Sequence, residues 1–123
     1  MSVKLRAAAL AAVALAGTAG VAVAHDAVVG TTPARGAVLQ NLPPKVSMTF
    51  GEPVGRIDGV RVTRNGRGDF TRSSQIDPRN ASRVVATLKR PGGKARKGLW
   101  KVTWRITSAD GHRQVFTAGF RVR

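Results

Sequence analysis

The amino-acid sequence predicts an all-β domain, built as a two-sheet antiparallel β-sandwich of immunoglobulin-like shape. No helical periodicity of useful length follows residue 24, whereas apolar and polar residues alternate in several short segments. Turn-forming residues such as Gly, Pro and Asn separate these segments. The 123 residues suffice for one domain, and an apolar content of 42% suffices for a small core.

Residues 1–24 have the features of a secretory signal peptide. Two basic residues near the start precede a weakly apolar run, and Ala22-Val23-Ala24 fits the small-x-small pattern that signal peptidase accepts. The alternative is a membrane anchor, but the run is rich in Ala and shorter than the ~20 strongly apolar residues of a membrane span. We expect cleavage after Ala24, which leaves residues 25–123 as an exported domain that begins with His25.

The clearest alternation lies in residues 45–50, 100–107 and 116–122, each of which predicts a strand with one buried face. Residues 57–63 and 83–88 are rich in β-branched side chains and predict two shorter strands. The side chains expected in the core are Val46, Met48, Phe50, Trp100, Val102, Trp104, Ile106, Phe116, Ala118, Phe120 and Val122. The turn signals between the strands are Leu42-Pro43-Pro44, Asn65-Gly66, Asp77-Pro78 and Pro91-Gly92-Gly93.

The chain is strongly basic, with 21 Lys and Arg against 6 Asp and Glu and a formal charge of +15. Such a balance is common in nucleic-acid-binding proteins, but the densest basic stretch, residues 89–97, has no aromatic residue to stack on bases. We therefore predict no nucleic-acid partner. The basic surface is expected to face water, anionic lipids or cell-wall polymers, with membrane contact at most peripheral. Arg67-Gly68-Asp69 resembles an adhesion tripeptide, although chance alone explains it in an Arg- and Gly-rich loop.

Few side chains are available for catalysis or for metal binding. The chain has no Cys, which excludes disulfides, thiolate metal sites and Cys nucleophiles. No Ser/His/Asp order supports a catalytic triad, and no Gly-rich loop supports a phosphate site. We therefore expect a protein that is not an enzyme.

The two His occupy distinctive positions. His25 becomes the first residue after the expected cleavage, so its α-amine and its Nδ1 atom form a chelate for one metal ion. The second His lies in Asp110-Gly111-His112, directly after a predicted strand, and the Gly allows the two flanking side chains to converge. Three nitrogens and one carboxylate favour tetragonal Cu(II), with Zn(II) as the second choice. From the spacing alone, a plain Asp-Gly turn without metal is the alternative.

Four blocks of the sequence resemble the bacterial CopC family of periplasmic copper-binding proteins. Residues 98–112 are similar to the family pattern Gly-x-Tyr-x-Val-x-Trp-Arg-Val-x-Ser-Ala-Asp-Gly-His almost position for position. Residues 44–54 resemble Pro-x-x-Val/Ile-x-Leu-x-Phe-Ser-Glu-Pro-Val, and residues 31–37 resemble the Ser/Thr-x-Pro-Ala-x-Gly opening. Residues 116–122 fit the closing strand, so the resemblance covers nearly the whole of residues 25–123.

The resemblance implies a seven-stranded Greek-key sandwich that binds Cu(II) through His25, Asp110 and His112. It further implies a monomeric periplasmic protein of copper resistance, which carries or buffers copper. The implied partner is an inner-membrane copper transporter of the CopD type. The Met-rich Cu(I) segment of some relatives has no counterpart here, which points to a member specific for Cu(II).

Three further positions near the implied site differ in what they suggest. Glu52 matches an acidic position near the copper in some relatives. The resemblance therefore implies that Glu52 weakly supports the copper site without being a ligand. Asp26 stands where Ala is usual, either as an outer-sphere acceptor for His25 or as a neighbour without a role. Arg113 replaces a frequent Pro and would lower metal affinity if its side chain pointed inward.

Two other classes of function stay open at this point. A monocopper oxidative enzyme would also use an N-terminal His chelate, but this chain has no Tyr, and Asp110 would fill the position that oxygen needs. A structural or adhesion module of immunoglobulin-like fold would bind no metal, and both His would then be incidental.

Overall fold

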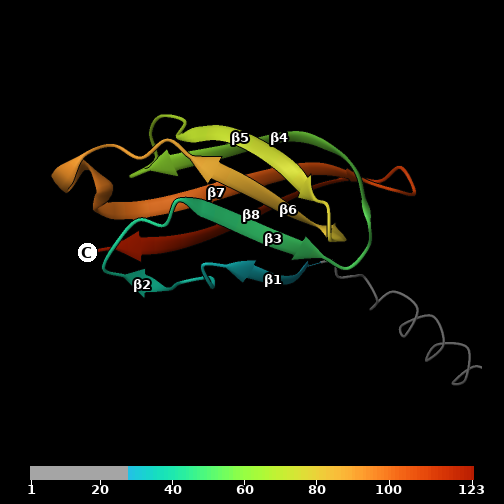
Figure 1. Cartoon of the computed structure of the whole chain (residues 1–123), viewed down its shortest axis with the longest axis horizontal. Coiled ribbons are helices and arrows are strands. Elements are labelled where there is room, and N and C mark those ends of the chain that lie inside the picture. The colour runs from blue at the N-terminus through green and yellow to red at the C-terminus, as the bar shows by residue number, and fades with distance from the viewer. Residues whose placement is uncertain (1–27) are drawn as a thin grey trace, which may run out of the picture.

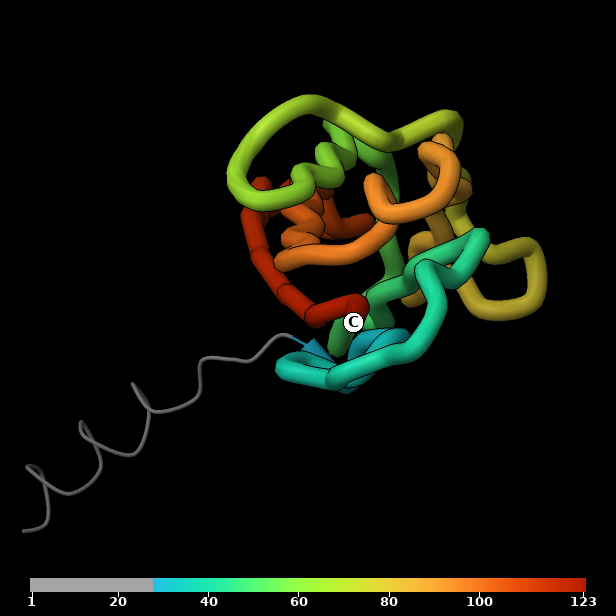
Figure 2. The backbone as a smooth tube through the Cα atoms, turned by 90° about the vertical axis from the view of Figure 1, so that its left-hand side faces the viewer, coloured from blue at the N-terminus to red at the C-terminus, as the bar shows by residue number. Residues whose placement is uncertain are grey.

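The structure, a computed structural model, describes residues 28–123 and contains two β-sheets (Figure 1). One sheet has the strand order β1-β3-β6-β5 and the other the order β2-β8-β7-β4. Figure 2 looks along the long axis of the molecule and shows the two layers on either side of the interior. The elements are β1 (Val28–Thr32), β2 (Val38–Leu39), β3 (Lys45–Phe50), β4 (Val54–Arg64), β5 (Thr71–Asp77), β6 (Asn80–Leu88), the 3₁₀ helix η1 (Gly93–Arg96), β7 (Gly98–Ser108) and β8 (Arg113–Val122). Within residues 28–123, no helix is both long enough and apolar enough to cross a membrane.

The strand order without β2 is that of an immunoglobulin constant-type sandwich, in which a sheet of four strands faces a sheet of three through Greek-key connections. The predicted all-β sandwich is therefore confirmed. Residues 28–123 form eight strands instead of the predicted seven, because Val38–Leu39 forms β2, which pairs in parallel with β8. Two residues are too few to display alternation, so no sequence pattern predicts this strand.

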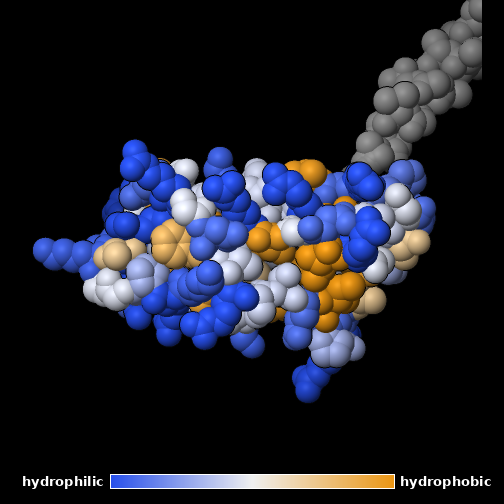
Figure 3. All heavy atoms as spheres, turned by 90° about the horizontal axis from the view of Figure 1, so that it is seen from above, coloured by the Kyte–Doolittle hydropathy of each residue, from blue (hydrophilic) through white to orange (hydrophobic). Residues whose placement is uncertain are grey.

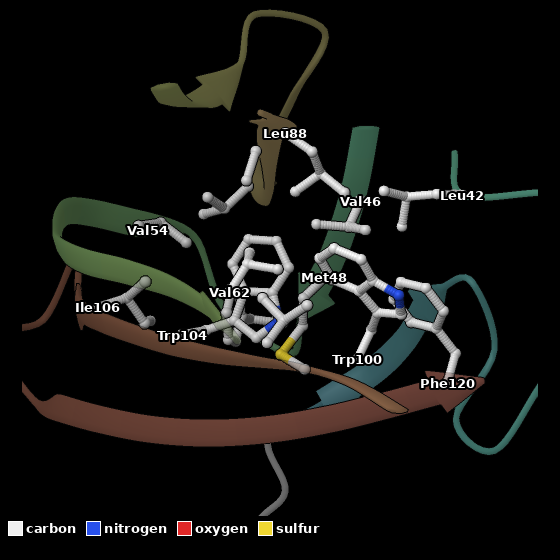
Figure 4. Close-up of a cluster of buried hydrophobic side chains, with 14 of the residues drawn as sticks. Leu42, Val46, Met48, Val54, Val62, Leu88, Trp100, Trp104, Ile106 and Phe120 are labelled. Carbon is white, nitrogen blue, oxygen red and sulfur yellow. The ribbon is translucent and has the colours of Figure 1, made fainter. Parts of the chain in front are cut away.

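The core lies between the sheets and contains the side chains that alternation assigns to it (Figure 4). In β7, the alternating residues from Trp100 to Ile106 are each at most 3% exposed, because this strand is central in its sheet. Phe116 and Ala118 of β8 are only partly buried. The short β2 covers β8 only at Arg121 and Val122, so the beginning of β8 behaves as a sheet edge.

The outward face of β3 departs from simple alternation. Ser47 is expected to face solvent but is buried, because the side chain of Arg83 from β6 donates a hydrogen bond of 3.1 Å to its Oγ atom. The Nε atom of Arg83 also lies 4.0 Å from a carboxylate oxygen of Asp77. On the outer surface of this sheet, Arg83 therefore lies beside two polar partners, Ser47 and Asp77.

One end of the sandwich gathers the segments that the sequence analysis singled out. Val28 at the start of β1 pairs with Phe50 at the end of β3. Val54 at the start of β4 pairs with Ser108 at the end of β7, and the turn from β7 to β8 follows directly. We call this end, where these four residues lie, the turn end; it is on the right in Figure 1, opposite the C-terminus.

The surface is mainly hydrophilic, as the side of the molecule in Figure 3 shows, with apolar residues visible between the polar ones. The large apolar side chains that are exposed among the described residues are Val29, Val38, Leu99 and Val115. The last three belong to β2, β7 and β8, and thus to a single sheet.

Candidate metal centre

The turn between β7 and β8 is held by backbone hydrogen bonds. The N–H of Ser108 donates to the carbonyl oxygen of His112 at 2.9 Å, and the N–H of Gly111 donates to the carbonyl oxygen of Ser108 at 2.9 Å. Gly111 has a φ of 94°, in the left-handed region where glycine carries little cost. The conformation of the turn is therefore fixed by these two backbone hydrogen bonds, and it depends on the glycine between Asp110 and His112.

The side chains of Asp110 and His112 converge above this turn. The Nδ1 atom of His112 lies 3.0 Å from Oδ2 of Asp110, and the backbone N–H of His112 donates to Oδ1 at 3.3 Å. The hydroxyl group of Ser108 donates a further hydrogen bond to Oδ1. The convergence predicted from the Asp-Gly-His spacing is thus present, whereas the role of these residues as ligands stays a prediction.

These contacts lower the pKa of Asp110 to about 2. The hydrogen bond from the Ser108 hydroxyl is the largest cause, and the hydrogen bond with the His112 side chain is the second. The carboxyl group is therefore ionised at every physiological pH and has no proton to lose before it binds a cation. Both side chains are open to solvent, since His112 is 76% exposed and Asp110 is 49% exposed.

Glu52 lies in the neighbouring turn, between β3 and β4, and is exposed. The carbonyl oxygen of Pro53 accepts a hydrogen bond of 2.9 Å from the N–H of Ala109. A Cβ atom added to Gly55 would lie 3.2 Å from the Cα atom of Ala109. The turn that carries Glu52 is therefore packed, backbone against backbone, on the turn that carries Asp110.

The described residues supply only part of the predicted ligand set. Within residues 28–123, no group of three or more His, Asp or Glu side chains is arranged to hold a metal ion. The structure brings together Asp110 and His112, and it places Glu52 in the adjacent turn. His25 and Asp26, together with the expected signal peptide, lie outside the described residues.

Ser108 is a contributor that the sequence analysis missed. It is 3% exposed, and its hydroxyl group lies under the turn, where it also contacts the carbonyl oxygen of His112 at 3.2 Å. A Ser two residues before an Asp is a spacing at which local side-chain hydrogen bonds form. That spacing in Ser108-Ala109-Asp110 is the sequence feature that could have indicated this role.

Arg113 follows His112 directly in the sequence, and its charge acts on Asp58 of β4. Hydrogen bonds from Thr107 and Arg56 lower the pKa of Asp58, and the charge of Arg113 contributes in the same direction. Arg113 also pairs with Thr107 across β7 and β8. Its charge therefore lies on the outer face of the sheet, beside Asp58.

The tripeptide Arg67-Gly68-Asp69 has a structural role in the connection between β4 and β5. The Oδ1 atom of Asp69 accepts hydrogen bonds from the backbone N–H groups of Thr71 at 3.0 Å and Val62 at 3.3 Å. The carboxylate that an adhesion receptor would need is thus engaged within the chain. The geometry gives no support to the adhesion hypothesis.

Comparison with known proteins agrees with the architecture. A family model described as the CopC domain matches residues 28–123. The structure is similar to that of CopC from Methylosinus trichosporium OB3b, with a TM-score of 0.67 and 17% identity over 80% of this chain and 93% of that chain. It is also similar to PcoC from Escherichia coli, described as a methionine-rich copper resistance protein, with a TM-score of 0.62 and 20% identity over 81% of this chain and 100% of that chain.

A second structure of PcoC from Escherichia coli, in its selenomethionine form, gives a TM-score of 0.65 and 18% identity over 78% of this chain and 98% of that chain. At these identities, the solved structures establish the fold alone. Comparison with the curated proteins gave no match. The family model nevertheless spans the whole described sandwich, including both turns at the turn end. The resemblance predicted from the sequence is therefore confirmed, and the chain belongs to the CopC family.

Proposed function

We propose that this protein binds one Cu(II) ion at the turn end of the sandwich, and that it carries or buffers copper in the periplasm as part of copper resistance. The observation that carries the proposal is the contact of Asp110 with His112 at the end of the molecule where β1 begins. The two PcoC structures that share this fold are described as those of a copper resistance protein, which supports the same function.

The separation of the two side chains suits adjacent ligands of one tetragonal ion. Two donor atoms that each lie about 2.0 Å from a metal, at a right angle, are about 2.8 Å apart. The Nδ1 atom of His112 and the Oδ2 atom of Asp110 are 3.0 Å apart, so a small adjustment lets both bind the ion in place of the hydrogen bond between them. Because any proton on Nδ1 must leave, binding at this pair is expected to weaken in acid.

The remaining nitrogens come from the N-terminus in this proposal. His25 precedes Val28 by three residues, which span at most about 10 Å of extended chain. Val28 pairs with Phe50 in the sheet, and Phe50 precedes Glu52 by two residues. The turn that carries Glu52 is itself packed on the turn that carries Asp110. An α-amine and an imidazole from His25 would then complete a site of three nitrogens and one carboxylate, which favours Cu(II).

Glu52 and Asp26 are proposed to act outside the ligand set, as carboxylates that favour a cation near the turn end. Their negative charge matters because the chain as a whole is strongly basic, with a formal charge of +15. Asp110 fills the fourth tetragonal position, which leaves no strong open site for oxygen. We therefore propose a carrier and not an oxidative enzyme.

The same proposal covers export and delivery. Residues 1–24 act as a signal peptide that is cleaved after Ala24, and the monomeric protein delivers copper to an inner-membrane transporter of the CopD type. Intact mass measurement of the exported protein tests the cleavage site directly, because only cleavage after Ala24 exposes the amine of His25.

The decisive experiment adds one Ser before His25 in the chain of residues 25–123. We expect Cu(II) affinity to fall by several orders of magnitude, because an amide nitrogen replaces the amine and its proton is far less acidic. Affinity is measured by competition with a colorimetric chelator. His112→Ala is the reference variant, and it should lose one nitrogen hyperfine coupling in electron paramagnetic resonance. Equal affinities of the extended and unextended chains would show that the amine is not a ligand.

A further inference from the structure

The outer face of the β2-β8-β7-β4 sheet carries several exposed cations. The register of β7 and β8 places Lys101 opposite Gly119, Arg105 opposite Val115 and Leu99 opposite Arg121, all pointing away from the core. The exposed basic residues on this face are Arg56, Arg61, Lys101, Arg105, Arg113 and Arg121. We call this set the basic face.

The one carboxylate among the described outward residues of this face is already occupied. Asp58 accepts hydrogen bonds from Nε of Arg56 at 2.7 Å and from the hydroxyl group of Thr107 at 2.6 Å. The other cations of the basic face have no acidic side chain within 4.0 Å in the described part of the chain. Their positive charge is therefore available to an external anion.

The opposite sheet carries fewer exposed cations, namely Lys45 of β3, Arg72 of β5 and Arg79 in the turn from β5 to β6. The outward residues of its β5 and β6 are mainly Ser, Thr, Gln and Val. Its central cation, Arg83, is only partly exposed and lies beside Ser47 and Asp77. Exposed cations are therefore more numerous on the basic face than on the opposite sheet.

An apolar groove of about 640 Å³ lies at the C-terminal end of the basic face. Val38 and Leu99, which are 54% and 52% exposed, line it together with Gly119. Lys101 and Arg121 also line the groove. Exposed apolar side chains surrounded by cations are typical of surfaces that lie in the interface of an anionic bilayer.

We propose that the basic face binds the surface of a bilayer that contains anionic phospholipid. The cations extend along β8 from Arg113 to Arg121, about 25 Å of strand, so they match an extended array of phosphates rather than a single anion. The face is the outer surface of a β-sheet, which suits an extended partner. At one end, Val38 and Leu99 enter the interface, where their apolar area leaves water.

The test uses residues 25–123, which include the complete described sandwich without the apolar leader. Binding is measured by co-sedimentation with vesicles of phosphatidylcholine alone, or of phosphatidylcholine with about 30% phosphatidylglycerol. The face variant is Lys101→Gln, Arg105→Gln and Arg121→Gln. The control variant, Lys45→Gln, Arg72→Gln and Arg79→Gln, removes the same charge from exposed positions of the other sheet.

We expect binding to the anionic vesicles only, and a loss of roughly a hundredfold in the partition coefficient of the face variant, at about fivefold per cation. The control variant should bind nearly as well as the unchanged protein, and about 0.5 M salt should abolish binding. Equal losses in the two variants, or no binding at low salt, would overturn the proposal. Binding to polyglutamate without binding to vesicles would assign the face to an acidic protein and would also overturn it. None of these results depends on copper, so the proposed function is tested separately.

Discussion

Ser108 donates its hydroxyl hydrogen bond to Asp110 from a buried position below the turn, and this bond is the largest cause of the low pKa of Asp110. The folded state thus holds the carboxyl group ionised more firmly than the unfolded chain does, because its pKa is lowered from 3.8 to about 2. A lowered carboxyl pKa favours the folded state at pH values above about 4. This contribution is lost as the pH falls from about 4 toward 2.

Ser108→Ala is expected to raise the pKa of Asp110 from about 2 toward 3.8, without reaching it, because the contact with His112 stays in place. The measurement is a pH titration of the Asp110 carboxyl carbon by nuclear magnetic resonance. Thr107→Ala is the matched control, since it removes the hydroxyl group that lowers the pKa of Asp58 and should leave Asp110 unchanged. An unaltered Asp110 titration in Ser108→Ala would contradict the role assigned to Ser108.

The pair Asp110 and His112 could be predicted from the sequence, because both residue types bind metals and a Gly lies between them. The roles of Ser108 and Arg113 could not be predicted in the same way. Whether Ser108 lies under the turn depends on the pairing of β7 with β4, and whether Arg113 faces Asp58 depends on the register of β8. Both are long-range properties that local spacing does not contain.

The turn that carries Glu52 and the turn that carries Asp110 approach each other closely at Gly55, where a side chain would be crowded. Gly55 begins the bulged part of β4, and a Cβ atom there would lie 3.2 Å from the Ala109 Cα atom and 3.2 Å from the Ser108 carbonyl oxygen. Both neighbours are backbone atoms, so they can move only if the turn of Asp110 moves with them. The position of the candidate ligands is therefore coupled to β4.

Gly55→Ala is expected to displace the turn and to lower Cu(II) affinity by about tenfold or more, since misplaced ligands no longer share one ion. Amide chemical shifts of Gly111 and His112 report the displacement, and chelator competition reports the affinity. Gly59→Ala is the control in the same strand, because a Cβ atom at Gly59 meets nothing within 4 Å. Unchanged shifts in Gly55→Ala would mean that the two turns move independently.

The strands that were predicted and those that were missed differ in their burial. β3, β7 and β8 bury one face in the core, so their apolar residues alternate visibly. β5 lies at the edge of its sheet and consists mainly of polar residues, from Thr71 to Asp77, so it shows no apolar alternation. β1 is an edge strand as well, and its residues are at best partly buried. Their pairing with β6 and β3, not their own sequence, makes them strands.

Copper binding at the turn end should stabilise the entire sandwich, because the proposed ligands come from segments that meet only in the folded state. A ligand that binds only the folded form adds about 4 kcal/mol at a thousandfold excess over Kd. For a domain of this size, each kcal/mol raises Tm by ~4–8 °C. The gain should disappear in acid, where protons compete for the imidazoles and the amine.

We therefore expect Cu(II) to raise Tm by about 15 °C or more at pH 7, and the rise to fade below about pH 5. Circular dichroism melts of residues 25–123 with and without Cu(II), at two pH values, provide the measurement. His112→Ala, whose side chain is exposed and outside the core, should melt normally without copper and gain much less with it. A shift that persisted undiminished at pH 4 would exclude a site of imidazoles and amine.

The strands that carry the basic face run along it and finish at the turn end, so the turn end lies at one edge of this face. In the proposed membrane-bound state, a sheet that lies flat on the bilayer keeps its strands parallel to the membrane, so the turn of Asp110 and His112 would lie beside the lipid headgroups instead of facing away from them. A copper ion bound at the proposed site would then be held close to the plane in which the proposed transporter diffuses. In the proposed arrangement, the encounter with the proposed transporter would take place in two dimensions, and its rate would depend on the number of carriers per area of membrane instead of their concentration in solution.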